Sequence, residues 1–234
     1  MVSVFDWDNT VHKGYTIYEW IKHLLKAGYD VQKLIFIFDA YKDLYTKRRI
    51  SHDEFAMKFN ESYCVFFKDW SEAELFNELG EFIKSDKEKL FPFAIDAFKY
   101  FKAYNIPIII VTGAPSMIVE KYKEILDIDV ILGFECEIAD GKLTGCVESN
   151  FGLDKSKTMK IIKAIYSGRT IGFGDSESDL PIINNGDIGI IVDNENLNKK
   201  IKNDSILNIR SDEDFSKLKS FFAGKNLMEN NVNE

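Results

Sequence analysis

The sequence predicts an α/β protein, with a doubly wound parallel sheet and a helical cap subdomain inserted after the first strand. Three observations predict this fold. Short apolar runs alternate with helical patterns, as in parallel sheets whose strands are joined by helices. A long stretch with only helical periodicity separates the first run from the second. Acidic or small polar residues directly follow several runs, where open parallel sheets build their sites.

Five apolar runs are expected to form the sheet, because β-branched and aromatic residues favour buried strands. The expected strands are residues 2–6, 107–112, 130–132, 170–174 and 188–192. Residues 134–147 are predicted to add a β-hairpin after the third strand, with its turn at Asp140-Gly141.

Residues 14–90 are predicted to form the cap, because their apolar residues fall into helical stripes that suit packing between helices. The stripes contain Tyr18, Ile21, Leu24 and Leu25, then Leu34, Ile37, Phe38, Tyr41, Leu44 and Tyr45, then Phe55, Phe59 and Tyr63. Residues 1–13 and 91–222 are expected to form the α/β core. The polar, Asn-rich residues 223–234 are expected to fray.

The composition favours a soluble enzyme. With 234 residues, of which 45% are apolar, the chain is long enough for a full core and one inserted subdomain. A net charge of −8 without a basic tract argues against a nucleic-acid partner. No apolar run is long enough to span a bilayer, and the start lacks the features of a signal peptide. We therefore expect a cytoplasmic protein without a membrane partner.

The cysteines Cys64, Cys136 and Cys146 show no metal-ligand spacing and are expected to be reduced, partly buried thiols. In a hairpin that turns at residues 140–141, Cys136 would lie opposite Gly145, so it would not face Cys146.

The first expected strand ends in two carboxylates, Asp6 and Asp8, which Asn9 and Thr10 follow. Successive side chains of a strand point to opposite faces, so the two carboxylates are expected on the same side. Two like charges this close repel each other unless a cation or a shared proton lies between them. For this pair alone, a polar strand end that runs into a turn is the alternative. His12 is close in sequence, but we assign no chemistry to it.

The second expected strand and a later helix offer groups that suit an anion. Thr112 and Gly113 would present a hydroxyl and free backbone N–H groups, although an ordinary loop can begin in the same way. Lys155 and Lys157 begin a helix. Cations are disfavoured near the positive end of a helix dipole, so a lysine there indicates either a nearby anion or full solvation.

The strand at residues 170–174 leads into two acids, Asp175 and Asp179. Asp175 would lie at the strand tip and Asp179 one helical turn later, so both can face the same point. Hard oxygen ligands at a strand end suit Mg²⁺. A helix start capped by Asp175 or Ser176 is the structural alternative, and it is compatible with a metal site.

These motifs occur in the order DxDxT, Thr, Lys and GDxxxD. This order resembles the haloacid dehalogenase superfamily of aspartate-nucleophile phosphohydrolases, over most of the chain. Residues 111–117, 139–145 and 155–162 further resemble the subfamily that includes phosphoserine phosphatase.

The resemblance implies a role for each motif. Asp6 would attack phosphorus and become an aspartyl phosphate, which divides one difficult hydrolysis into two displacements. Asp8 would protonate the leaving alkoxide and then accept a proton from the attacking water. Thr112 and the Gly113 N–H would bind the phosphoryl oxygens. Lys155 would neutralise the phosphoryl group and the Asp6 carboxylate.

The resemblance also implies a Mg²⁺ cofactor. The ion would be held by Asp6, the backbone carbonyl of Asp8 and Asp175, with Asp179 in or next to its coordination sphere.

Two positions bear on how closely the chain follows the family pattern. That pattern has apolar residues four and seven positions after the lysine, which favours Lys155, with Met159 and Ile162, over Lys157. Asn9 replaces the usual small residue between Asp8 and Thr10, and because Asn tolerates turn conformations we expect altered turn packing only.

The cap gives less information about the substrate. Phosphoserine phosphatases carry a glutamate nine residues after the nucleophile, but Tyr15 stands there and Glu19 is out of register. Phosphoserine is therefore not expected to be the main substrate. Arg48 and Arg49 could meet an acidic substrate group, with a solvated helix end as the alternative.

The leading hypothesis is a Mg²⁺-dependent phosphatase acting on a small phosphorylated metabolite. A phosphotransferase or phosphomutase that uses the same aspartyl phosphate is the first alternative, and a non-catalytic binding protein on this fold is the second. Asp8 argues against dehalogenase chemistry, because dehalogenases of the superfamily lack an acid at this position.

Overall fold

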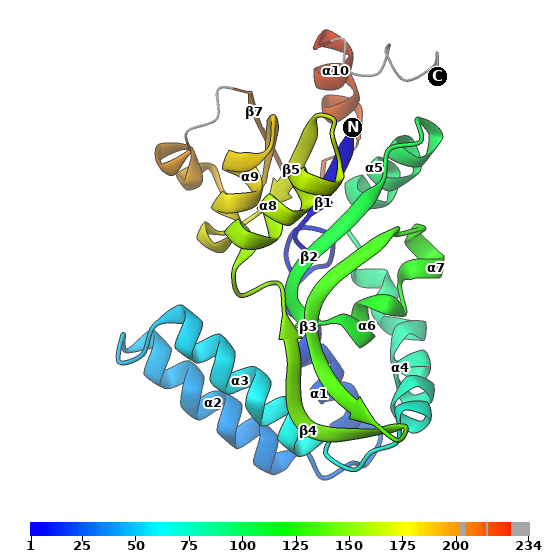
Figure 1. Ribbon diagram of the computed structural model, residues 1–234, viewed down its shortest axis with the longest axis vertical. Helices are drawn as coiled ribbons and strands as arrows, with labels where there is room; N and C mark the ends of the chain where they lie inside the picture. Colours follow the sequence, from blue (N-terminus) through cyan, green and yellow to red (C-terminus); the bar gives the residue numbers. More distant parts are fainter. Residues whose placement is uncertain (202–204, 214, 226–234) are drawn as a thin grey trace.

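The structure, a computed structural model, describes residues 1–201, 205–213 and 215–225. Its strands are β1 (Val2–Phe5), β2 (Ile108–Pro115), β3 (Val130–Ala139), β4 (Lys142–Asn150), β5 (Thr170–Gly174), β6 (Ile188–Val192) and β7 (Ile206–Ile209). They form one sheet in the order β4-β3-β2-β1-β5-β6-β7 (Figure 1). Only β4 runs antiparallel to its neighbour among these described strands. The predicted α/β fold with a doubly wound sheet is confirmed.

The first strand lies in the middle of the sheet. β1 pairs with β2 on one side and with β5 on the other, and Phe5 is opposite Ile110 and Phe173. The carboxyl ends of these three parallel strands therefore meet at one edge, which is where ligand sites of open α/β sheets form.

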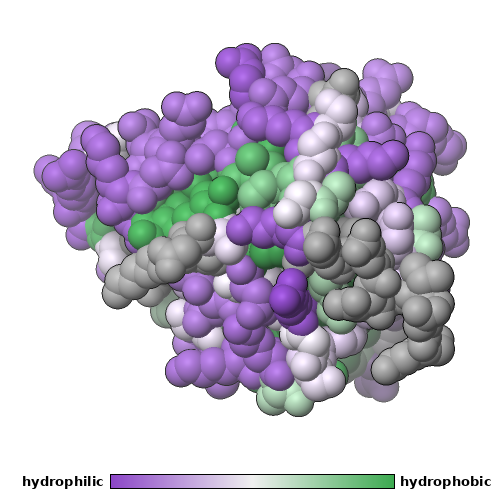
Figure 2. Space-filling model, turned by 90° about the horizontal axis from the view of Figure 1, so that it is seen from above, coloured by the Kyte–Doolittle hydropathy of each residue, from purple (hydrophilic) through white to green (hydrophobic). Residues whose placement is uncertain are grey.

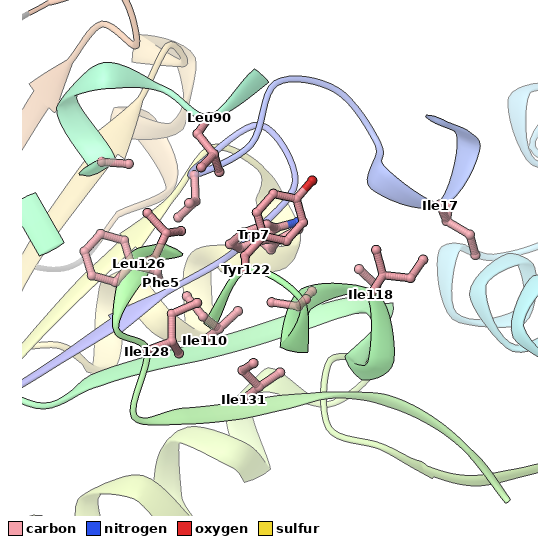
Figure 3. Close-up of a cluster of buried hydrophobic side chains, with 14 of the residues drawn as sticks. Phe5, Trp7, Ile17, Leu90, Ile110, Ile118, Tyr122, Leu126, Ile128 and Ile131 are labelled. Carbon is pink, nitrogen blue, oxygen red and sulfur yellow. The ribbon is translucent and has the colours of Figure 1, made fainter. Parts of the chain in front are cut away.

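Helices lie on both faces of the sheet and in the segment of residues 16–86. They are α1 (Thr16–Lys26), α2 (Gln32–Thr46), α3 (His52–Phe66), α4 (Glu72–Asp86), α5 (Pro92–Ala103), α6 (Ser116–Glu120), α7 (Lys123–Leu126), α8 (Lys155–Ile165), α9 (Leu180–Asn185) and α10 (Ser216–Gly224). On one face, Met159 of α8 and Ile182 of α9 belong to a buried cluster with Val4. On the other, Phe5 and Leu126 belong to the main core (Figure 3).

The helices α1 to α4 occupy most of the predicted cap. α2 and α3 lie side by side and project from the rest of the molecule (Figure 1). Phe38 of α2 stacks on Phe59 of α3, with 3.6 Å between the ring centroids. Trp20 of α1 meets Phe82 of α4 at 5.5 Å. The aromatic stripes thus pack helix against helix, and the assignment of residues 14–90 to a separate subdomain stays a prediction.

The predicted hairpin has a different extent and register. The antiparallel pairing and the turn at Asp140-Gly141 are confirmed. β3 continues without a break from Val130 to Ala139, so the third strand itself forms the first arm of the hairpin with β4. Register shifts in the ladder place Cys136 opposite Val147, not opposite Gly145, because irregularities of this kind add residues that spacing alone cannot reveal. Cys136 instead contacts Cys64 of α3, with the Sγ atoms 3.1 Å apart.

Other boundaries also differ from the expectation. β1 ends at Phe5, β2 continues to Pro115, and β7 was not predicted. Cys146 is exposed, which corrects the expectation of partial burial, while Cys64 and Cys136 are buried free thiols. α10 extends to Gly224, so the first residues of the predicted tail are helical, and residues 226–234 lie outside the described part.

The surface agrees with the charged composition. Seen from above, hydrophilic residues cover most of the face, with one hydrophobic strip between them (Figure 2). Among the helices of the described residues, none has the length and apolar character to cross a membrane.

Candidate active site

The structure brings together the side chains that follow the central strands. Asp6 comes directly after β1, Asp179 ends a 3₁₀ turn (Glu177–Asp179) after β5, and Lys155 is the first residue of α8. The Lys155 Nζ atom lies 2.6 Å from Asp6 Oδ1 and 2.6 Å from Asp179 Oδ1. All three side chains are buried, so the ammonium group bridges two carboxylates away from water.

The two lysines at the start of α8 have different surroundings. Lys155 is only 6% exposed, whereas Lys157 is exposed and offers its backbone N–H to the capping carboxylate of Asp154. Burial alone would lower the pKa of Lys155, but the charges of Asp179 and Asp6 outweigh it and raise that pKa above its usual value. Lys155 is therefore charged despite its place at a helix start.

Asp6, Asp175 and Asp179 form an acidic cluster in which one oxygen of each carboxylate lies within 4.8 Å of the others. Burial and the charge of Asp179 raise the pKa of Asp6 well above its usual value and that of Asp175 to about 7. Burial also opposes ionisation of Asp179, but bonds from Lys155 and Ser176 lower its pKa. Three hard oxygen donors that repel one another fit a divalent cation, whose charge would relieve that repulsion.

Two contacts that the sequence did not indicate hold Asp175 in place. The Thr10 hydroxyl donates to Asp175 Oδ1 at 3.2 Å. The Asn194 side chain donates to the Asp175 backbone carbonyl at 2.8 Å. Thr10 belongs to the first motif and orients the carboxylate, whereas Asn194 follows β6 and fixes the backbone of Asp175.

The carboxylate of Asp8 is not part of the acidic cluster. Its Oδ1 atom accepts hydrogen bonds from the Thr16 hydroxyl at 2.6 Å and from the Thr16 backbone N–H at 2.9 Å. Burial raises the pKa of Asp8, and the bonds from Thr16 oppose that rise. Both bonds use Oδ1, and neither uses Oδ2.

Asn9 makes the turn after the first motif. Its φ angle is +62°, a left-handed conformation that Asn adopts more readily than most residues. Its side-chain oxygen also accepts the Gly14 N–H at 2.9 Å. Asn9, which differs from the family pattern, thus stabilises this turn through both its backbone conformation and its side chain.

Thr112 and Gly113 lie where β2 changes register against β3. Thr112 is buried and its hydroxyl accepts the Ala114 N–H at 3.0 Å, while Gly113 is exposed. Gly152 packs directly on this segment: a Cβ atom there would lie 2.1 Å from the Thr112 carbonyl oxygen and 2.4 Å from the Gly113 nitrogen. Sequence analysis had assigned no role to Gly152.

Replacing Gly152 is expected to damage both stability and activity. The added methyl group of Gly152→Ala meets backbone atoms, which cannot move aside without shifting Thr112 and Gly113. We expect a loss of about 1–3 kcal/mol in the free energy of unfolding, measured with denaturant, together with weaker substrate binding. Gly80→Ala in α4 is the control, because nothing lies near its Cβ and alanine favours helices. Equal stability of the two variants would contradict this packing.

The family model for haloacid dehalogenase-like hydrolases matches residues 3–184. The chain belongs to this family. No curated protein sequence gives a significant match to this hydrolase.

Solved structures share the fold of this hydrolase at low sequence identity. A protein of unknown function from Bordetella pertussis Tohama I has a TM-score of 0.72 and 18% identity, over 85% of this chain and 93% of that one. A probable phosphoserine phosphatase from Vibrio cholerae has a TM-score of 0.69 and 16% identity, over 99% and 66%. A phospho-aspartyl intermediate analogue of phosphoserine phosphatase has a TM-score of 0.64 and 20% identity, over 94% and 97%.

The candidate substrate contacts of the hydrolase differ in their availability. Tyr15 is 59% exposed, and partial burial and the charge of Asp175 raise its pKa, so its phenol lies in the field of the acidic cluster. Glu19 is instead bound to Lys22 and Lys89, at 2.7 Å each. Arg48 and Arg49, at the turn after α2, are exposed.

Proposed function

We propose that this hydrolase is a Mg²⁺-dependent phosphatase that cleaves a small phosphomonoester through an aspartyl phosphate on Asp6. The observation that carries this proposal is the buried bridge from Lys155 to Asp6 and Asp179, beside a third carboxylate from Asp175. A site of this kind combines a nucleophile, a fixed positive charge and oxygen ligands for a cation, and all three are needed to bring a carboxylate to a phosphate dianion.

Asp6, Asp175 and the backbone carbonyl of Asp8 would hold the ion, with Asp179 beside it. When bound, Mg²⁺ supplies charge neutralisation for the phosphoryl group. Lys155 adds a second, fixed positive charge, and Thr112 would bind a phosphoryl oxygen through its hydroxyl.

The reaction then takes two displacements. An oxygen of Asp6 forms a bond to phosphorus while the ester P–O bond breaks, and Asp8 gives its proton to the leaving alkoxide. Asp8 next accepts a proton from water, whose oxygen attacks phosphorus and releases Asp6 as a carboxylate. The raised pKa of Asp8 suits the first of these proton transfers, because a buried carboxyl group keeps its proton at a higher pH.

The similar structures and Tyr15 bear on the identity of the small substrate. Of the three similar structures named above, one is described as a probable phosphoserine phosphatase and another as a phospho-aspartyl intermediate analogue of phosphoserine phosphatase, which supports the reaction type. Tyr15 cannot offer the negative charge that a substrate amine would require. We therefore propose a phosphorylated metabolite other than phosphoserine.

A panel of phosphorylated metabolites, including phosphoserine, tests the function. We expect phosphate release from one compound far above the others, loss of that activity after chelation, and its return on adding Mg²⁺. Undiminished hydrolysis after complete metal removal would contradict the metal site. Transfer of the phosphoryl group to an added alcohol in preference to water would favour the phosphotransferase alternative, and no turnover of any compound would contradict the proposal.

A further inference from the structure

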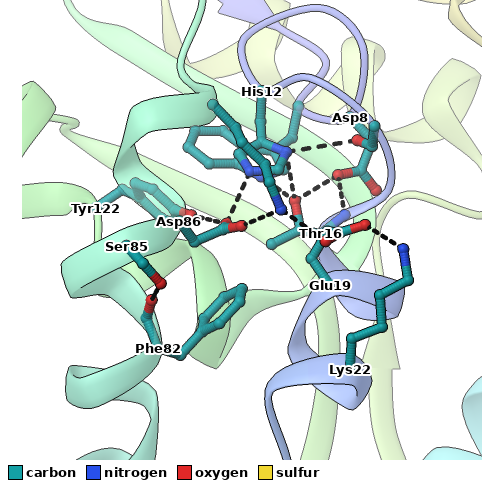
Figure 4. Close-up of polar contacts among 12 residues, drawn as sticks. Asp8, His12, Thr16, Glu19, Lys22, Phe82, Ser85, Asp86 and Tyr122 are labelled. Carbon is teal, nitrogen blue, oxygen red and sulfur yellow. Dashed lines mark hydrogen bonds and ion pairs between the residues drawn. The ribbon is translucent and has the colours of Figure 1, made fainter. Parts of the chain in front are cut away.

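A buried network of polar side chains leads away from Asp8 (Figure 4). The Thr16 hydroxyl, which donates to Asp8 at 2.6 Å, accepts the Trp7 indole N–H at 2.8 Å and lies 3.3 Å from His12 Nδ1. The other ring nitrogen of His12, Nε2, lies 2.8 Å from Asp86 Oδ2. These contacts join Asp8 to a histidine–aspartate pair through one hydroxyl.

Asp86 is itself held from two sides. The Tyr122 hydroxyl donates to Asp86 Oδ2, and Lys89 Nζ lies 2.8 Å from Asp86 Oδ1. Burial would raise the pKa of Asp86, but the bonds from His12, Lys89 and Tyr122 outweigh it and lower that pKa, so Asp86 is an anion. A buried anion with three donors is a fixed acceptor, and it locks the ring orientation of His12.

The members of this network are deeply buried although they are polar. His12 and Thr16 are 0% exposed and Asp86 is 3% exposed. Burying a histidine, a carboxylate and a hydroxyl together is unfavourable unless each is bonded, and an apolar core of the same shape would cost less. The arrangement is therefore better explained by a task at Asp8 than by stability.

The network also joins the two chain segments that connect the helices α1 to α4 with the sheet. His12 lies on the segment from β1 to α1, and Asp86 ends α4 just before the chain returns to α5. The two segments pair through backbone bonds, from Phe91 N–H to the Val11 carbonyl and from Lys13 N–H to the Lys89 carbonyl, at 2.9 Å each. His12 thus fixes the loop after Asp8 to a second, separate segment.

We propose that His12 and Asp86 are positioning residues for the reaction: they hold Thr16, and Thr16 holds Asp8 by Oδ1, so that Oδ2 faces the leaving group. This inference rests on the proposed function. The Thr16 oxygen accepts from Trp7 while its only proton goes to Asp8, so its contact with His12 is a hydrogen bond that Nδ1 donates. Because Nε2 donates to the Asp86 carboxylate, this arrangement requires a proton on both ring nitrogens of His12.

If His12 positions Asp8 as the acid, the effect of replacing His12 depends on the leaving group. A nitrophenolate leaves without protonation, whereas an alkoxide needs a proton from Asp8. In His12→Phe we expect release of the alcohol from a simple alkyl phosphate to slow about 10–100-fold in the first turnover, and release of nitrophenol to slow less than about threefold. Thr16→Val is expected to slow the alkyl ester selectively in the same way. Thr16→Ser keeps the hydroxyl and is expected to retain the wild-type rates on both esters.

Second variants and a matched control keep the test independent of folding. If His12→Phe does not fold, His12→Gln and Asp86→Asn retain the size and polarity of the pair and are expected to show the same selective loss. His23 forms another histidine–carboxylate contact, 3.0 Å from Glu78, and neither residue bonds a member of this network. His23→Phe is therefore expected to change neither rate. Thermal unfolding reports the stability of each variant.

Three outcomes would overturn the inference. Equal slowing of both esters in the His12 and Asp86 variants would indicate a structural role only, and unchanged rates on both would indicate no role. If the wild-type protein hydrolysed neither these esters nor any compound of the metabolite panel, the proposed function would be overturned, and the inference with it. The first two outcomes, with an active wild type, leave the proposed function intact.

Discussion

Asp6→Asn is expected to abolish phosphate release, with a loss of at least about 10⁴-fold, while the protein stays folded. An amide does not form a stable bond to phosphorus in place of a carboxylate, so both displacements are lost. Asparagine keeps the shape of the side chain, and Lys155 retains Asp179 as a partner. Removing one charge from a cluster of repelling carboxylates should not lower the unfolding temperature. Phosphate assays and thermal unfolding measure the two effects.

Asp96→Asn is a suitable control, because Asp96 is an exposed residue of α5 with only a distant ion pair, 3.8 Å to Lys99. Its rate should match that of the wild-type protein. Near-normal turnover by Asp6→Asn would refute the assignment of the nucleophile.

Lys155→Met is expected to have the next largest effect, because it removes the charge that Asp6 and Asp179 share. We expect activity to fall by about 10³-fold, the scale seen when one charge-stabilising donor is lost. Removing one partner of a buried ion pair typically costs about 3–5 kcal/mol in the free energy of unfolding, and we expect a loss of that size. Denaturant unfolding and steady-state kinetics measure these effects.

Lys157→Met is the matched control for this substitution, since the two lysines are neighbours on α8 and Lys157 is exposed. We expect the free energy of unfolding of Lys157→Met to change by less than about 0.5 kcal/mol and its kinetics to equal those of the wild-type protein. If Lys157→Met lost as much activity as Lys155→Met, the assignment by burial would be wrong.

The central part of the fold could be predicted because its signals are local. Strands such as β5 and β6 are continuous apolar runs of buried residues, and they occur where expected. β7 (Ile206–Ile209) escaped prediction because only Ile209 of its residues is fully buried, so its pattern is weak. The register of β3 and β4 depends on irregularities that the sequence does not mark.

The acidic cluster was also within reach of the sequence, because each of its residues follows a strand whose end could be recognised. The network behind Asp8 was not. His12 and Asp86 are 74 positions apart, and Tyr122 is 36 positions further on, so only the folded chain brings them together. Thr16, which directly bonds Asp8, lies at the start of a helix where a hydroxyl normally serves as an ordinary polar residue.

Trapping the phosphorylated enzyme tests the central claim most directly. The protein would be mixed with its substrate and Mg²⁺, quenched in acid during turnover, and cleaved after Lys13, and the peptide of residues 1–13 examined by mass spectrometry. We predict one additional phosphoryl group on Asp6, absent from Asp6→Asn. Borohydride reduction, which converts an acyl phosphate to an alcohol, would confirm the linkage. Continued phosphate release with no phosphoryl group on Asp6, or with the group on another residue, would contradict the account.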